Sequence, residues 1–169
     1  VFMAPTELLA EQHAINLEKW LTPLGINTTL LTGKLTEKQK RERIKQIASG
    51  EISVIIGTHA LFQESVSYHA LNLVVIDEQH RFGVEQRLML QKKAPEGFTP
   101  HQLMMTATPI PRTLAMTLYA DLSSSVIDEY PPNRIPITTS VISDKARDKV
   151  IERVKAQCQE GTQVYWVCT

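Results

Sequence analysis

The chain has no excess of charge of either sign and no long apolar run. Its 169 residues include 18 basic and 18 acidic side chains, so bulk attraction to nucleic acid or to an anionic membrane is excluded, and any such contact must be local. No apolar run is long enough to cross a bilayer, and no basic segment leads into a signal-like core at the N-terminus. We therefore expect a cytoplasmic protein with no membrane partner.

Cysteine is scarce as well. Cys158 and Cys168 are the only two, and neither stands in a Cys-x-x-Cys pair with histidine partners. This spacing argues against a zinc site. We predict that both are buried, reduced thiols.

A glycine-rich phosphate loop is also missing. Such a loop needs Gly-x-x-x-x-Gly-Lys followed by Ser or Thr, so that backbone amides surround phosphates and the lysine reaches them. Gly33 and Lys34 are followed by Leu35, and Thr28 stands where the first glycine should be. We interpret Gly33 as a turn residue after a strand.

What the chain does contain is an alternation of short apolar runs with amphipathic segments. Strands are predicted at residues 1–4, 28–31, 54–57, 73–76 and 103–106. Their near-continuous apolar character implies burial on both faces. The pattern predicts an α/β fold in which a doubly wound parallel sheet carries helices on both faces.

Helix signals separate these strands. Thr6 is predicted to cap a first helix, which Pro23 and Gly25 end. Its apolar face is predicted to carry Ala10, Ala14, Leu17 and Leu21. Thr36 and Gln39 form a capping-box signature for a second helix, which Gly50 closes.

The composition changes near residue 128. Residues 128–136, DEYPPNRIP, are polar and interrupted by proline, which is typical of an interdomain linker. We predict three parts: a partial first lobe at 1–128, a linker at 129–137 and the beginning of a second α/β lobe at 138–169. In the second lobe, strands at 137–142 and 164–168 should flank a helix capped by Asp144. Two strands and one helix cannot bury both faces, so this part should pack on the first lobe, pair with another copy or be loosely ordered.

The most informative stretch is residues 74–87, VVIDEQHRFGVEQR. An apolar strand ends there in two carboxylates, and the carboxyl ends of parallel strands form the ligand crevice of an open α/β sheet. Asp77 could hold Mg²⁺ through water while Glu78 orients and deprotonates an attacking water, a pairing suited to nucleotide hydrolysis. The alternative is a strand end that simply leads into a helix.

Several motifs in order resemble a known family. Asp-Glu-Gln-His at 77–80 resembles the DExH box of superfamily 2 helicases and translocases. Residues 81–84, RFGV, and 106–113, TATPIPRT, narrow the resemblance to the branch that holds RecG-like and Mfd-like proteins. Gln79, with residues 85–87, EQR, favours the RecG-like group. Residues 3–13, MAPTELLAEQH, resemble motif Ia, and residues 57–61, GTHAL, resemble motif Ib, so the match covers essentially the whole chain.

The resemblance implies roles for the residues of the box and of motif III. It makes Asp77 the organiser of Mg²⁺, Glu78 the catalytic base, and Gln79 with His80 the link between nucleotide state and DNA. Thr106, Ala107 and Thr108 resemble motif III, which couples hydrolysis to DNA movement. The alternative for these three residues is a simple helix cap. Arg112 could touch DNA or brace motif III.

The resemblance also places DNA contacts in two loops. These contacts are assigned to Pro5, Thr6, Glu7, Gly57, Thr58 and His59. Exposed amides and helix N-termini favour phosphates without reading bases. The alternative is ordinary strand-to-helix turn chemistry.

The implied parent enzyme is a bacterial, nucleoid-associated ATP-dependent DNA helicase. RecG-like proteins use two RecA-like lobes, ATP and Mg²⁺ to remodel branched DNA and stalled replication forks in recombination and repair. On this reading the chain is a segment that starts after the P-loop, and we expect it to be inactive alone and to bind no cofactor tightly. A missing strand beside Val1 would leave an open sheet edge, so either a dimer through that edge or a rearranged N-terminus is expected.

Two alternatives remain open at this stage. An Mfd-like transcription-repair coupling translocase would share the motifs up to Arg112, although Gln79 argues against it. A non-catalytic binding or assembly module would explain the missing phosphate loop. A P-loop encoded immediately before Val1 would separate a motor segment from a degenerate module.

Overall fold

The structure is a computed structural model that describes residues 1–83, 89–90, 92–95, 97–108 and 123–167. The chain folds as two compact units, Val1–Asp121 and Leu122–Thr169. None of the described helices is long and apolar enough to span a membrane.

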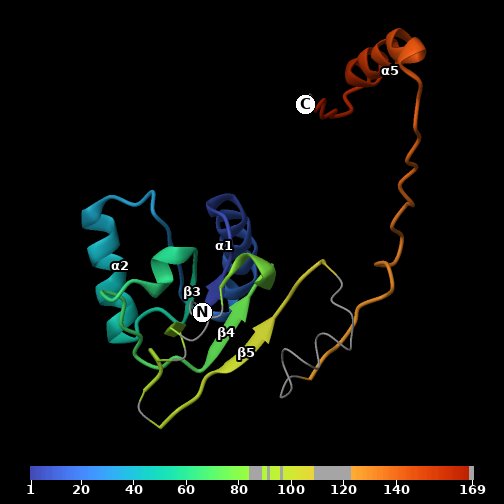
Figure 1. Cartoon of the computed structure of the whole chain (residues 1–169). Coiled ribbons are helices and arrows are strands. Elements are labelled where there is room, and N and C mark those ends of the chain that lie inside the picture. Colours follow the sequence, from blue (N-terminus) through green and yellow to red (C-terminus); the bar gives the residue numbers. More distant parts are fainter. Residues whose placement is uncertain (84–88, 91, 96, 109–122, 168–169) are drawn as a thin grey trace. The chain divides into compact units, whose positions relative to one another are not determined.

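The first unit contains a five-stranded sheet in the order β2-β3-β1-β4-β5 (Figure 1). The strands are β1 (Phe2–Met3), β2 (Thr28–Leu31), β3 (Val54–Gly57), β4 (Leu73–Ile76) and β5 (His101–Met104). Every pairing between neighbours is parallel. The prediction of a parallel α/β sheet is therefore confirmed, and the fifth strand begins two residues earlier than predicted.

Among the described residues of this unit, helices α1 and α2 begin and end where their caps predict. The side chain of Thr6 accepts a hydrogen bond from the Leu9 amide at the start of α1 (Glu7–Leu21), and the turn that follows ends at Gly25 with φ of 71°. Thr36 and Gln39 form a reciprocal capping box at the start of α2 (Glu37–Ser49). Gly50 closes α2 with φ of 80°, a left-handed conformation that glycine adopts at little cost.

The sheet separates two layers of core side chains. Met3, Leu31 and Ile55 belong to the cluster that includes Ile47 of α2. Their chain neighbours Phe2, Leu30 and Ile56 belong to the cluster that includes Ala10 of α1. Successive strand residues point to opposite faces, so α1 and α2 cover opposite faces of the sheet.

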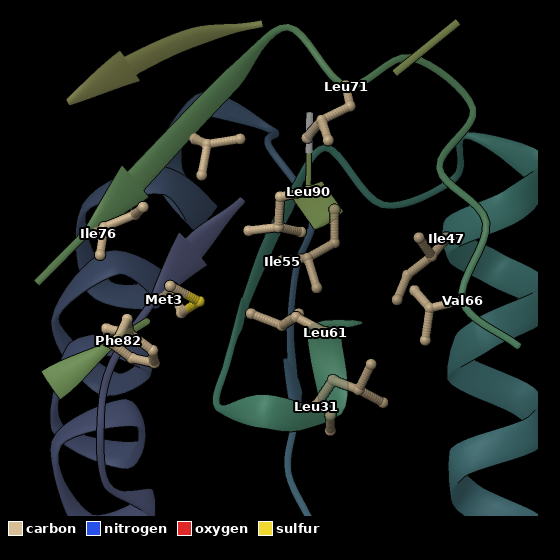
Figure 2. Close-up of a cluster of buried hydrophobic side chains, with 12 residues drawn as sticks. Met3, Leu31, Ile47, Ile55, Leu61, Val66, Leu71, Ile76, Phe82 and Leu90 are labelled. Carbon is tan, nitrogen blue, oxygen red and sulfur yellow. The ribbon is translucent and has the colours of Figure 1, made fainter. Parts of the chain in front are cut away.

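The larger cluster lies on the α2 side and is closed by residues from the connecting loops (Figure 2). Leu61, Val66, Leu71 and Phe82 are buried there beside the strand residues. This core holds the strand ends, which carry the candidate site, in fixed positions.

The edges of the sheet are not where the sequence suggested. β1 is the central strand and pairs with β3 on one side and β4 on the other. The expected open edge beside Val1 is therefore wrong, because the chain returns twice to flank this strand, and the edge strands are β2 and β5. On the β2 edge, the Arg43 guanidinium of α2 donates a hydrogen bond to the Leu30 carbonyl, which satisfies an otherwise unpaired acceptor.

The second unit confirms the predicted helix but not the predicted strands. A short turn, η4 (Asp144–Ala146), leads into α5 (Arg147–Gln159). Asp144 is not the cap, because it lies inside the first turn, where Ser143 precedes it. The described residues at 137–142 and 164–167 form no strand, since a ladder needs a hydrogen-bonded neighbour and none is present in the described part of this unit.

Cys158 corrects a second prediction. Its thiol is exposed rather than buried. The reason is that α5, all of whose residues are described, buries none of its side chains. Cys168 lies outside the described residues.

Candidate active site and nucleic-acid interface

The candidate residues lie at one edge of the sheet. Because all strands are parallel, the residues that follow β1, β3, β4 and β5 emerge at their common carboxyl end. The Asp77 amide donates to the Met3 carbonyl at 2.9 Å, and the Gln79 amide donates to the Met105 carbonyl at 3.0 Å. The segment after β4 is thus bonded to the strands on both sides of it.

Asp77 has both carboxylate oxygens engaged. Oδ1 accepts the Glu78 amide at 3.0 Å, and Oδ2 lies 2.8 Å from Nε2 of His13. The Asp77 side chain keeps 21% of its surface exposed and the His13 side chain 27%. Asp77 is therefore held in one orientation but remains open to solvent.

His13 is a residue that the sequence analysis did not single out. It lies in the middle of α1, and its ring packs against Phe2 with centroids 4.5 Å apart. Its partner Asp77 is 64 residues away in the sequence. The available signal was its place at the end of the motif Ia-like stretch, two helical turns after the Thr6 cap.

Glu78 adopts a left-handed backbone conformation with φ of 50° and ψ of 55°. This region costs a non-glycine residue about 1–2 kcal/mol, and residues in such conformations cluster at functional sites. Oε2 of Glu78 lies 3.5 Å from Oγ1 of Thr106, 3.4 Å from the Ala107 amide and 3.5 Å from Nδ1 of His80. These are long contacts, of the kind that tighten when a ligand completes a site.

The structure therefore brings two residues of the box, Glu78 and His80, against the motif III-like segment. His80 also contacts Thr106, with Nδ1 and Oγ1 3.4 Å apart. Oγ1 of Thr106 in turn accepts the Thr108 amide at 3.1 Å. A single hydroxyl thus touches a carboxylate, an imidazole and a backbone amide.

Gln79 and Arg112 differ from the rest of the predicted set. The Gln79 side chain is only 9% exposed, and its Oε1 has no hydrogen-bond partner among the described residues. Its position favours a contact inside the protein rather than with solvent. Arg112 lies outside the described residues.

The oxygen donors at this edge fit a hydrated Mg²⁺ bound together with phosphate. The described residues hold no cluster of three or more His, Cys, Asp or Glu side chains that could cage a metal. Mg²⁺ usually keeps several waters and uses one or two carboxylates with substrate phosphates, so a full protein cage is not required. Each engaged oxygen of Asp77 retains lone-pair capacity for such a water.

The loops predicted to meet DNA line one cavity of about 420 Å³. Its lining includes Pro5 and Thr6 after β1, Glu7 at the start of α1, and Thr58 and His59 after β3. Gly33, Ala60 and Gln63 complete it. The two motif-like loops are therefore adjacent in space.

Gly57 does not line this cavity but fixes its wall. A Cβ at this position would lie 2.2 Å from the Leu31 carbonyl oxygen, so only glycine fits there. The Gly57 carbonyl accepts the Ala4 amide at 2.9 Å, which ties the two loops together. Thr58 is 7% exposed, and its amide donates to the Leu31 carbonyl at 3.4 Å.

Charge at this cavity is balanced locally. The Nζ of Lys34, next to Gly33, lies 3.3 Å from a carboxylate oxygen of Glu7 and 3.3 Å from one of Glu11. The hydrogen bonds to Glu11 and Glu7 raise the pKa of Lys34. The ammonium is exposed, so its ion pairs with Glu7 and Glu11 contribute little to stability.

Aromatic contacts join the loop after β3 to the segment that follows β4. The His59 ring lies 5.8 Å from the Phe82 ring and 6.2 Å from the Phe62 ring, measured between centroids. Phe82 follows the box and is only 5% exposed. The loop that lines the cavity thus rests on the segment that carries Glu78 and His80.

Comparison with known proteins agrees with this geometry. The profile of the DEAD/DEAH box helicase family matches residues 1–117. The chain is 60% identical over 169 residues to the ATP-dependent DNA helicase RecG of Escherichia coli (strain K12), covering 99% of this chain and 24% of that protein. It is 57% identical to RecG of Haemophilus influenzae with the same coverage of 99% and 24%, so it spans about a quarter of the length of these curated relatives.

Solved structures give the same result. A structure of RecG bound to a three-way DNA junction is similar with a TM-score of 0.76 and 38% identity, covering 96% of this chain and 21% of that one. The yeast DEAD-box splicing factor Prp28, 18% identical, is similar with a TM-score of 0.51 over 70% of this chain and 29% of its own. The second likeness concerns the fold alone. The resemblance to RecG-like helicases expected from the motifs is confirmed.

Proposed function

This chain belongs to the DEAD/DEAH box helicase family, and we propose that it forms part of the motor of an ATP-dependent DNA helicase of the RecG type. Residues 1–128 would belong to a first RecA-like lobe and residues 138–169 to a second, joined by the linker at 129–137. The observation that carries the proposal is the contact of Glu78 with Thr106 and Ala107 at the carboxyl edge of the parallel sheet.

In this proposal the box residues hydrolyse ATP. Asp77 would hold Mg²⁺ through water, and the ion would stabilise negative charge on the phosphates of ATP. Glu78 accepts the proton of the attacking water, and its left-handed backbone places its carboxylate against the Thr106 hydroxyl. A change at the phosphate would alter the contacts among Glu78, His80 and Thr106, which are weak enough to exchange.

The DNA-binding role rests on the cavity between the loops after β1 and β3. Pro5, Thr6, Glu7, Thr58 and His59 lie together there, while Gly57 fixes their spacing. Exposed amides at such loops bind phosphates without base specificity, which suits a motor that moves along any sequence. A RecG relative was solved on a three-way DNA junction, which supports branched DNA as the substrate.

The test uses the full-length protein that contains this segment. ATP hydrolysis is measured with a synthetic three-way junction, with linear duplex and without DNA. We expect stimulation that is greatest with the junction. Glu78→Gln should lower kcat by about 10²–10⁴, because the carboxylate can no longer accept a proton. Glu18→Gln, an identical change at an exposed position on α1, should have no effect.

Two outcomes would contradict the proposal. If the full-length protein does not hydrolyse ATP with any DNA, the motor assignment is wrong. If Glu78→Gln retains full activity while Mg²⁺ is still required, Glu78 is not the base. Stimulation that appears only with RNA polymerase bound to DNA would instead support the Mfd-like alternative.

A further inference from the structure

We propose that His13 is a positioning residue for Asp77, and that it sets the affinity of the site for Mg²⁺. This inference rests on the proposed function, since it takes Asp77 as the residue that holds Mg²⁺ through water. His13 would not touch nucleotide or metal. It would act through the orientation of the carboxylate.

The geometry gives Asp77 two fixed points. His13 Nε2 lies 2.8 Å from Oδ2, and the Glu78 amide donates to Oδ1 at 3.0 Å. A carboxylate that is bonded at only one oxygen can rotate about its Cβ–Cγ bond. With both oxygens bonded, its plane is determined, and so is the direction in which its free lone pairs point.

The His13 ring is itself held in place. It packs against the Phe2 ring with centroids 4.5 Å apart and planes inclined at 44°. Phe2 belongs to the central strand β1, which is bonded on both sides. Aromatic rings in contact prefer offset or tilted arrangements, so this contact favours one rotamer of the histidine. Asp77 is thus braced by the core through a single intermediate side chain.

Hydrogen bonds of this type influence metal affinity. With its proton on Nε2, the His13 ring donates to Oδ2 and leaves the second lone-pair site of that oxygen free for a metal-bound water. Loss of an outer hydrogen-bond partner of a metal-binding group typically lowers metal affinity or activity by about 10–100-fold. Asp77 binds through water, which transmits orientation less directly, so we expect the lower end of that range.

His13 also connects the two candidate sites along one helix. α1 begins at the Thr6 cap, which lines the cavity proposed for DNA. His13 lies seven residues further on, which is about 10 Å along the helix axis. The two candidate sites therefore share helix α1 and its cap.

The test compares His13→Ala, His13→Gln and Asn16→Ala in the full-length protein. Asn16 is exposed on the same helix and is the matched control. Two quantities are measured for each variant: the Mg²⁺ concentration that gives half-maximal ATP hydrolysis, and the dissociation constant of Mn²⁺ from the ADP complex, followed by electron paramagnetic resonance. Thermal unfolding verifies that each variant is folded.

We expect His13→Ala to raise both the half-maximal Mg²⁺ concentration and the Mn²⁺ dissociation constant by about tenfold. His13→Gln retains a donor of similar reach and should restore most of the loss, and Asn16→Ala should match the wild type. If the His13→Ala variant is folded and binds Mn²⁺ as tightly as the wild type, the inference is wrong. Equal impairment of a folded Gln variant and the Ala variant would also count against a hydrogen-bonding role.

The Mn²⁺ measurement separates this inference from the proposed function. A wild-type protein that binds Mn²⁺ and ADP but does not hydrolyse ATP would overturn the proposed function and leave the role of His13 to be decided by binding. A wild-type protein that hydrolyses ATP on DNA while a folded His13→Ala variant retains full Mn²⁺ affinity would overturn only the inference.

Discussion

Gly57 of β3 pairs with Leu31 of β2, and its lack of a side chain is a structural requirement. A Cβ there would lie 2.2 Å from the Leu31 carbonyl oxygen and 3.0 Å from Cγ of Leu61. The first of these atoms belongs to the backbone of a paired strand and cannot move away cheaply. The glycine is therefore needed for the sheet whether or not it also meets DNA.

Gly57→Ala should accordingly destabilise the protein by about 1–3 kcal/mol, the usual cost of overpacking a core. The measurement is the urea midpoint followed by circular dichroism. Gly83→Ala is the matched control, because a Cβ at Gly83 would meet no atom within 4 Å. An unchanged midpoint for Gly57→Ala would mean that the two strands separate easily, and the close approach would then be no reason for glycine.

Single residues also mark the limit of what the sequence could predict. Asp77 and Glu78 were identifiable because a buried apolar run ends directly in two charges. The contact of His13 with Asp77 was not, because a histidine on a helix gives no local sign of a partner 64 residues away. Gln79 stands between Glu78 and His80 in the box, and its sequence position gave no sign that its side chain is buried. Burial depends on the packing around a residue, which motif spacing does not specify.

At the scale of elements, helix α2 depends on its N-terminal cap. The Thr36 hydroxyl accepts the Gln39 amide at 3.3 Å, and the Thr36 amide donates to Oε1 of Gln39 at 3.1 Å. Thr36→Ala should lower the free energy of unfolding by about 1 kcal/mol, because it leaves a first-turn amide unpaired. Urea unfolding measures the change, and Thr99→Ala in an exposed loop serves as the control.

The capping interpretation makes a further distinction. Thr36→Ser keeps a hydroxyl acceptor and should retain most of the stability, whereas a role in β-branched packing would make Ser as harmful as Ala. Equal midpoints for the Ala variant and the wild type would show that α2 is fixed by its buried Ile47 rather than by its cap.

Elements with strong local signals were predictable, and elements that depend on neighbours were not. The strands at 28–31, 54–57 and 73–76 have the predicted bounds because each is an apolar run of the right length. β5 starts earlier, at polar residues His101 and Gln102, because it is an edge strand whose ladder with β4 determines its bounds. The segments at 137–142 and 164–167 were predicted as strands, but the described part of their own unit contains no strand with which they could pair.

At the scale of the whole molecule, the order of strands could not be read from the sequence. Five apolar runs with helices between them imply a parallel sheet, yet their order depends on which crossovers pack best. The structure places β1 in the centre, so the argument for a dimer through an open edge beside Val1 no longer applies. Proteolysis can test the division of the chain into the two units Val1–Asp121 and Leu122–Thr169.

Limited trypsin digestion should cut first at Arg134. This residue lies in an exposed stretch without regular structure, next to Tyr130 and Ile135, which are 81% and 85% exposed. Exposed backbone without ladder or helix hydrogen bonds fits most readily into a protease, whereas basic residues in α1 and α2 are protected by their helices. Mass spectrometry of the earliest product should therefore find a fragment that ends at Arg134.

Two variants make this prediction specific. Arg134→Gln should slow the first cut, while Arg41→Gln in α2 should leave its rate and position unchanged. If the earliest cut instead falls within residues 1–83, the first unit is less stable than its paired central strand and two packed faces imply. A first cut at Arg134 that leaves 1–134 resistant would mean that the sheet carrying Asp77 and Glu78 folds without help from the residues that follow, and that the linker predicted at 129–137 is a true boundary between folding units.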